Sequence, residues 1–255
     1  MRKHCLSPIL AASGLALLVG SAQAATVLYQ HTFDGGTGSL GLVAPDTANT
    51  GIILGADHGT STANWVITGI NTPSFTQAGL IEDDTQGQLA FNPVDGYVYT
   101  LTFNATVSVS GGGDWSGLGF ADDSEGDRLF QTGVAWLIKR GNASTSSAFT
   151  DGTASNEGST TSAASTETYR IELDTRDGSG LWDAYFYQGA SSTAFATATN
   201  LGATLENSID TIAIGSEGST DTINSFSLVV AIPEPSSAML VGLAGLSVLT
   251  LRRRR

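Results

Sequence analysis

The 255-residue sequence predicts an all-β domain made of two stacked antiparallel sheets. Short runs of alternating or β-rich residues recur between residues 26 and 231, and clusters of Gly, Asn, Asp, Ser or Pro bound each run. No convincing amphipathic helix interrupts them. A domain covering residues 25–231 is long enough to bury a large core without disulfides or a metal, so its stability demands no cofactor.

Nine runs have the length and composition of strands. We expect strands at residues 26–33, 64–70, 97–109, 115–121, 134–140, 168–174, 181–188, 209–215 and 221–231. The clearest hairpin runs from Tyr169 to Tyr187, and both of its strands alternate apolar with polar residues. This alternation predicts one packed face and one face toward solvent.

The segment from Gly141 to Thr166 is rich in small polar residues. Of its 26 residues, 23 are Gly, Asn, Ala, Ser or Thr. A domain linker is one interpretation, but strands flank the segment on both sides. We expect a long surface loop with a short strand at Phe149.

Residues 1–24 have the features of a secretory signal peptide. Two basic residues precede an apolar run at residues 9–20, and Ala22 and Ala24 supply the small residues of a cleavage site. We expect export, with signal peptidase cutting after Ala24. A short anchor helix is the alternative, but the run is shorter than the ~20 residues of a membrane span.

A three-part block closes the sequence. Its parts are a Pro-Glu-Pro motif, an apolar stretch at residues 236–251, and a basic tail: Pro233, Glu234, Pro235, Arg252, Arg253, Arg254 and Arg255. The apolar stretch would form a transmembrane helix of about 24 Å, with the arginines reaching outward. Basic residues inside and an acidic body outside agree with the positive-inside rule.

Residues 232–255 resemble the PEP-CTERM sorting signal of Gram-negative bacteria, which has these three parts in this order. The resemblance implies recognition by an exosortase and cleavage near the Pro-Glu-Pro motif. It also implies membrane anchoring before processing, and then delivery to the cell surface or an extracellular polysaccharide matrix. An ordinary C-terminal membrane anchor is the alternative.

Charge and cysteine content exclude several classes of function. Residues 25–231 carry 5 basic and 23 acidic side chains, a net charge of −18, which would repel nucleic acid. Cys5 is the only cysteine, and it would leave with the signal peptide. The mature chain would then have no disulfide, no cysteine zinc ligand and no catalytic thiol.

The body of the chain resembles a concanavalin A-like (laminin G-like) jelly roll in three respects. These are the strand spacing, the late Tyr-Arg-Ile-Glu-Leu-Asp hairpin that begins at Tyr169, and the closing strand from Ile223 to Val230. An immunoglobulin-like or carbohydrate-module sandwich is the competing architecture. About thirteen short strands exceed what an immunoglobulin domain holds, which favours the jelly roll.

One acidic segment suggests glycoside hydrolysis. Laminarinase-type hydrolases with this jelly roll carry an E-x-D-x-x-E strand, and Glu172, Asp174 and Asp177 approach that pattern. The third position is Asp177, one methylene shorter, and it falls in a Gly-rich turn. Charged residues alternating with apolar ones are also typical of any solvated strand face, so we expect no enzyme.

Acidic loops and histidines are the candidates for metal binding. Carboxylates suit Ca²⁺, and the cluster that we select as a Ca²⁺ site is Asp122, Asp123, Glu125 and Asp127, ahead of a second cluster at residues 82–84. Such loops are also common as solubilising surface. His31 and His58 are too few for a three-histidine zinc site, and we expect two unrelated surface residues.

Aromatic residues are the candidates for sugar stacking. We expect Trp136 and Trp182 in the core. Tyr185 and Tyr187 lie on the other face of their strand from Phe186 and are the better candidates for ligand contact. The sequence thus predicts a non-catalytic exported protein associated with exopolysaccharide. The alternatives are a carbohydrate-active enzyme and a calcium-dependent, lectin-like adhesin.

Overall fold

The computed structural model describes thirteen segments of one compact unit, Ala24–Pro233. The segments are residues 25–33, 38–69, 74–76, 79–81, 85–106, 115–122, 133–140, 145–151, 155–161, 166–177, 181–201, 209–217 and 222–232. The expected signal helix, the expected C-terminal helix and all the sorting residues lie outside these segments. Among the described residues, no helix has the length and apolarity needed to cross a membrane.

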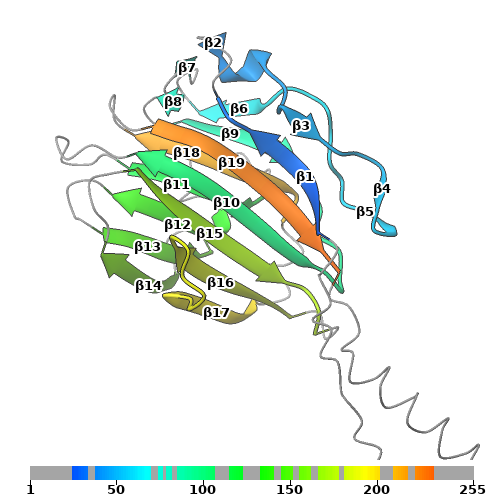
Figure 1. The fold of residues 1–255 in the computed structure, drawn as a ribbon, viewed down its shortest axis with the longest axis vertical. Coiled ribbons are helices and arrows are strands. Elements are labelled where there is room, and N and C mark those ends of the chain that lie inside the picture. Colours follow the sequence, from blue (N-terminus) through cyan, green and yellow to red (C-terminus); the bar gives the residue numbers. More distant parts are fainter. Residues whose placement is uncertain are drawn as a thin grey trace, which may run out of the picture. The chain divides into compact units, whose positions relative to one another are not determined.

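The larger sheet contains ten strands, and its described pairings are antiparallel (Figure 1). Strand β19 lies between β10 and β1, so the last strand of the domain joins the first. The order along the sheet is β17 (Ala196–Leu201), β16 (Trp182–Gln188), β15 (Thr166–Asp174), β10 (Val98–Thr106), β19 (Thr222–Ala231), β8 (Gly79–Ile81), β7 (Ser74–Thr76) and β2 (Gly38–Ser39), with β1 (Ala25–His31) between β19 and β3 (Thr47–Ala48).

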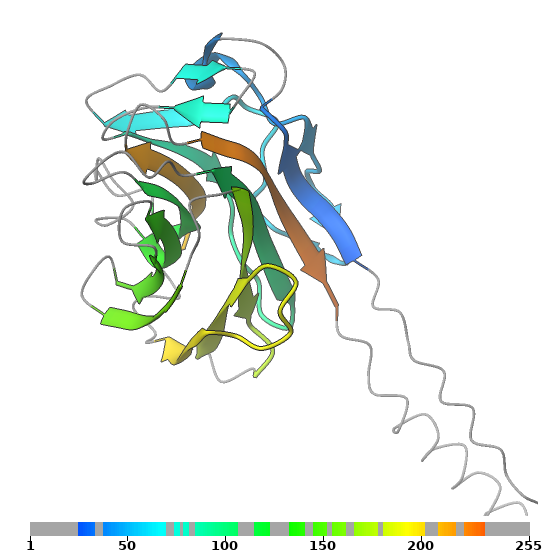
Figure 2. The ribbon, with the colours of Figure 1, turned by 60° about the vertical axis from the view of Figure 1, so that its left-hand side comes forward.

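The smaller sheet contains seven strands and forms the second layer (Figure 2). Its order is β14 (Ser155–Thr161), β13 (Thr145–Thr150), β12 (Gly133–Arg140), β11 (Trp115–Ala121), β18 (Thr211–Glu217), β9 (Thr85–Ala90) and β6 (Val66–Gly69). The remaining described elements are a two-stranded hairpin of β4 (Ile52–Ile53) and β5 (Ala56–Asp57), and a short 3-10 helix, η1 (Leu40–Leu42).

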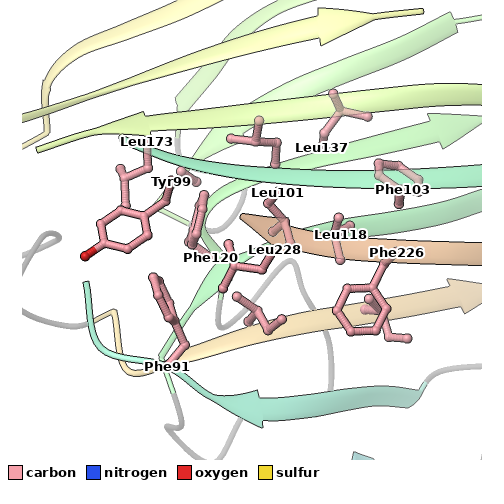
Figure 3. Close-up of a cluster of buried hydrophobic side chains, with 14 of the residues drawn as sticks. Phe91, Tyr99, Leu101, Phe103, Leu118, Phe120, Leu137, Leu173, Phe226 and Leu228 are labelled. Atoms are coloured by element: carbon pink, nitrogen blue, oxygen red, sulfur yellow. The ribbon is translucent and has the colours of Figure 1, made fainter. Parts of the chain in front are cut away.

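The main core lies between the two sheets (Figure 3). Strand β10 contributes Tyr99, Leu101 and Phe103, which are fully buried, while the residues between them are half-buried. Leu118 and Phe120 of β11 meet them from the other sheet. This period of two is the expected alternation, and it gives each central strand of the larger sheet one face in the core and one face outward.

The nine expected strands are confirmed as β1, β6, β10, β11, β12, β15, β16, β18 and β19. The expected loop at residues 141–166 is wrong, because β13 and β14 occupy half of it and extend the smaller sheet, although the expected strand at Phe149 is confirmed as part of β13. Small side chains suffice in β13 because large rings come from elsewhere: Trp136 of the neighbouring strand β12 stacks on Phe149, and Tyr169 of β15, in the other sheet, reaches Ser146 on the opposite face. The sequence of β13 and β14 therefore gives only a weak strand signal, although both strands form.

The register of β19 predicts different costs for two adjacent truncations. Leu228 is fully buried, whereas Val229 faces outward and is half-buried. Leu228→Ala is expected to lower the free energy of unfolding by about 2–5 kcal/mol. Val229→Ala is expected to cost less than about 1.5 kcal/mol. Chemical denaturation measures both, and equal costs would contradict this register.

Candidate functional site

The outward face of the larger sheet carries a line of mostly polar side chains that crosses six strands. Cross-strand pairing joins each member to the next. We call this line the polar row; its members, in order from β16 to β3, are Tyr187, Arg170, Thr102, Ser227, Gln30 and Thr47. Period-two alternation places the row outward, because the residues beside its central members are buried.

One end of the row is a fixed group of three side chains. The Arg170 guanidinium carbon lies 4.0 Å from the centre of the Tyr187 ring, and Arg170 Nε lies 3.0 Å from Glu172 Oε1. The Tyr187 hydroxyl donates to Glu172 Oε2 at 3.1 Å. Burial, followed by the nearby Glu172 charge, raises the pKa of Tyr187. The phenol therefore stays protonated, and the charges of Arg170 and Glu172 offset each other.

Tyr185 lies beside this group on the same face. It is half-buried, and its hydroxyl donates to Asp183 Oδ2 at 3.2 Å. Burial, followed by the Asp183 charge, raises the pKa of Tyr185. Tyr187 is only 9% exposed, less than the sequence suggested, because Arg170 stacks against its ring. Tyr185 therefore presents the more accessible of the two rings.

One hollow lies over the polar row, and a second is lined by residues of β15 and of the end of β16. The first, of about 340 Å³, lies over the centre of the row and is lined by Gln30, Thr32, Thr102, Phe103, Asn104, Thr168, Ser225, Phe226 and Ser227. The second, of about 530 Å³, is lined by Thr166, Glu167, Thr168, Gln188, Gly189 and Ala190. Thr168 lines both hollows. Sequence reasoning missed the residues of β1, β10 and β19, because only the pairing of distant strands brings them together.

Glu172 and Asp174, two carboxylates of the hydrolase hypothesis, are held by other groups. Glu172 contacts Arg170 and Tyr187, as described above. Burial would raise the pKa of Asp174, but the hydrogen bonds and charge of Arg176 outweigh it and hold that pKa below its ordinary value. Strand β15 ends at Asp174, and Asp177 is exposed in the following turn, as the sequence suggested. Asp174 is thus ionised at neutral pH and unsuited to donate a proton.

The proposed calcium site lies mostly outside the described residues, since only Asp122 of the four is described. Within the described ranges, no three His, Cys, Asp or Glu side chains come together to hold a metal ion.

Both histidines are buried, which corrects the expected surface positions. His31 occupies an inward position of β1, opposite Phe226, and its Nδ1 accepts a hydrogen bond from the Asp46 amide at 3.2 Å. His58 Nδ1 lies 2.9 Å from the Tyr99 hydroxyl, and its Nε2 lies 3.1 Å from the Ile53 carbonyl. His58 therefore ties the β4–β5 hairpin to the core, and the two histidines have separate surroundings.

The four tryptophans are buried and form no exposed stacking platform. Trp136 and Trp182 are 1% and 7% exposed, which confirms their expected core positions. Trp136 stacks on Phe149 at 4.9 Å on the face of the smaller sheet away from the main core. A Cβ on Gly119 would lie 2.3 Å from Trp136 Cβ, so the glycine lets this ring lie close to β11.

A buried polar cluster links the two sheets beside the larger hollow. The fully buried Lys139 of β12 donates from Nζ to Glu167 Oε2 of β15 at 2.9 Å. Tyr169 also donates to this carboxylate and accepts a hydrogen bond from Ser146 Oγ at 2.6 Å. Gln188 Nε2 donates to Glu167 Oε1 at 3.3 Å. The expected strands contained Lys139, but nothing in the sequence marked it as buried.

Comparison with solved structures identifies the fold. An endo-1,3-β-glucanase from Streptomyces sioyaensis is 16% identical, covers 84% of this chain and 100% of its own, and superposes with a TM-score of 0.51. The lectin UEA-II, solved with galactose, is 10% identical over 68% of this chain and 94% of its own, with a TM-score of 0.42. The VIP36 exoplasmic/lumenal domain, in its Ca²⁺/Man-bound form, is 12% identical over 67% of this chain and 84% of its own, with a TM-score of 0.41.

The chain is an all-β jelly-roll sandwich. The superposition covers the whole length of the glucanase and supports this assignment. At 16% identity, the similarity shows a shared fold and nothing about activity. No protein-family model matches the sequence. No curated protein matches it either.

His58 predicts a pH-dependent stability. Burial lowers its pKa below the ordinary value of 6.5. As the pH falls below about 6.5, the unfolded chain binds a proton that the folded chain does not, so stability falls until the folded-state pKa is reached. Unfolding free energies between about pH 5 and 8 measure this. His58→Gln is expected to flatten the slope below about pH 6.5, and an unchanged slope would contradict the account.

The Lys139–Glu167 pair predicts non-additive mutational costs. Glu167→Gln leaves the buried ammonium without its carboxylate and is expected to lower the free energy of unfolding by about 3 kcal/mol. The double variant with Lys139→Met is expected to recover most of this loss, because no buried charge remains. Denaturant unfolding of the two singles and the double completes the cycle. Simple additivity would show that the two groups do not interact.

Proposed function

We propose that this protein is a non-catalytic, exported surface or matrix protein that binds extracellular polysaccharide through the outward face of its larger sheet. The observation that carries the proposal is the polar row, which crosses six strands and lines a hollow of about 340 Å³. Hydroxyl and amide groups on this face suit the hydroxyls of sugars, and Tyr185 offers a half-exposed ring for the apolar face of a pyranose.

The carboxylates of the same face support binding over hydrolysis. A retaining or inverting glycosidase needs one carboxyl that holds a proton and a second that is free to act as base or nucleophile. Asp174 has a lowered pKa because of Arg176, and Glu172 is engaged by Arg170 and Tyr187. The third carboxylate, Asp177, is exposed in the turn beyond the end of β15 and not on the strand with Glu172.

Export and sorting complete the proposal. Signal peptidase would cut after Ala24, and an exosortase would act near Pro233, Glu234 and Pro235. The pairing of Ala25 with Ala231 supports this scheme, because these two residues are the first of β1 and the last of β19. Both cuts would therefore fall beyond the same end of two paired strands and would leave the sandwich whole. The C-terminal helix would hold the protein in the membrane until the second cut.

Binding to a polysaccharide panel tests the proposal. The full chain is titrated with neutral and acidic polysaccharides, with and without Ca²⁺, and reducing ends are measured in the same samples. We expect saturable binding without reducing-end release. Tyr185→Ala is expected to weaken binding by about 3- to 10-fold, and Tyr185→Phe, which keeps the ring, by about 2-fold at most.

Two results would contradict the proposal. Release of reducing ends that disappears in Glu172→Gln would make the protein a hydrolase. Absence of binding to every polysaccharide, with the chain folded, would remove the carbohydrate function. Binding abolished by a chelator would instead support the calcium-dependent lectin alternative, with Asp122, Asp123, Glu125 and Asp127 as its expected ligands.

A further inference from the structure

We propose that the ligand is a neutral, extended polysaccharide that lies across the strands along the polar row. It would contact β16, β15, β10, β19, β1 and β3 in turn. This inference rests on the proposed function and adds the class of ligand and the direction in which it runs.

The centre of the row has free hydrogen-bonding groups. In the described part of the chain, the side chains of Thr102, Ser227 and Gln30 have no hydrogen-bond partner in the protein, although all three are polar and only half-buried or exposed. Adjacent groups on the same face differ. Asn104 Nδ2 donates to Thr168 Oγ1 at 3.1 Å, and Asn104 Oδ1 accepts from Asn224 Nδ2 at 2.8 Å. The central members of the row are therefore free, whereas Asn104 beside them is engaged with its neighbours.

The shape of the face suits a chain that crosses the strands. The hollow of about 340 Å³ over the row contains all three free side chains, and its volume falls within the range of small-molecule sites. Neighbouring strands lie about 4.8 Å apart, so a side chain of the row recurs at that interval. One sugar unit of an extended polysaccharide advances by a similar length. Successive units could thus meet successive members of the row.

The charges favour a neutral ligand. Arg170 is the one charged member of the row, and Glu172 lies 3.0 Å from it. No free cation along the row would attract an acidic sugar, and the net charge of −18 on residues 25–231 repels polyanions. A polycation would instead bind the acidic surface in general, without selecting the row.

The row is bounded at its aromatic end and continues to an edge strand at the other. Arg170 Nη2 donates to the Ser191 carbonyl at 3.2 Å, so the connection between β16 and β17 lies beside Tyr187 and Arg170. Figure 1 shows this connection in yellow next to β16. At the far end, Gln30 pairs with Thr47 of the two-residue strand β3. A polysaccharide could therefore extend past β3, whereas the β16–β17 connection limits it near Tyr187.

A length series of neutral linear glucan oligosaccharides tests this inference on the full chain. Affinity, measured by titration calorimetry, is expected to rise with each added sugar up to about six units, one for each strand crossed, and then to level off. Thr102→Val removes one free hydroxyl at constant shape and is expected to weaken binding of the longest member by about 3- to 10-fold. Gln30→Ala is expected to weaken binding of the longest member by a similar factor.

Thr100→Val is the matched control. Thr100 lies two residues away on the same strand and faces the same side, but it pairs with Glu172 and Val229 instead of the row. Its replacement is expected to change affinity by less than about 2-fold. Thermal unfolding of each variant verifies that it is folded.

The outcomes separate this inference from the proposed function. Affinity that does not depend on oligosaccharide length, or equal losses in Thr102→Val and Thr100→Val, would show that the ligand does not follow the polar row. The proposed binding of polysaccharide would remain. A preference for acidic polysaccharides would overturn the ligand class. No binding to any polysaccharide would overturn the proposed function, and this inference with it.

Discussion

The pairing register of β10 with β15 and β19 is the constraint on which the rest of the structure depends. Tyr99, Leu101 and Phe103 must enter the core, and they find partners there from both sheets. Because side chains alternate along a strand, this burial turns Thr100 and Thr102 outward. A slip of one residue would exchange the two sets, placing threonines in the core and aromatic rings in water. The hydrophobic core thus determines which residues form the outward face.

Polar groups inside the sandwich reinforce this arrangement at separate places. Lys139 and Glu167 connect the two sheets, while His58 and Tyr99 attach the β4–β5 hairpin to the core. Each of these four buried groups has a partner, as burial requires. The outward face contrasts with these clusters, because side chains at the centre of its polar row have no partner within the described chain. This difference from the four paired groups distinguishes the row as a surface for a ligand.

The sequence predicted the fold where strands alternate strongly and failed where they do not. Strands β10 and β15 were readable because large apolar residues recur at every second position. Strands β13 and β14 were not, because serine, threonine and glycine dominate them, and the large rings that meet β13, Trp136 and Tyr169, lie on β12 and β15. His31 and His58 looked like surface residues, since nothing local shows that tertiary contacts bury them. The polar row was hidden for another reason: Gln30 and Ser227 become neighbours only through the pairing of β1 with β19.

Side-chain footprinting with a carbene or hydroxyl radical, with and without a saturating neutral polysaccharide, tests the central claim most directly. It reports which surfaces the ligand covers without altering the protein. The account predicts reduced labelling of the outward side chains of β1, β10 and β19, with Gln30, Thr102 and Ser227 among them. Labelling of Tyr185 on β16 should also fall, whereas labelling of the smaller sheet should remain unchanged. Protection confined to the smaller sheet, or no protection despite measured binding, would contradict the account.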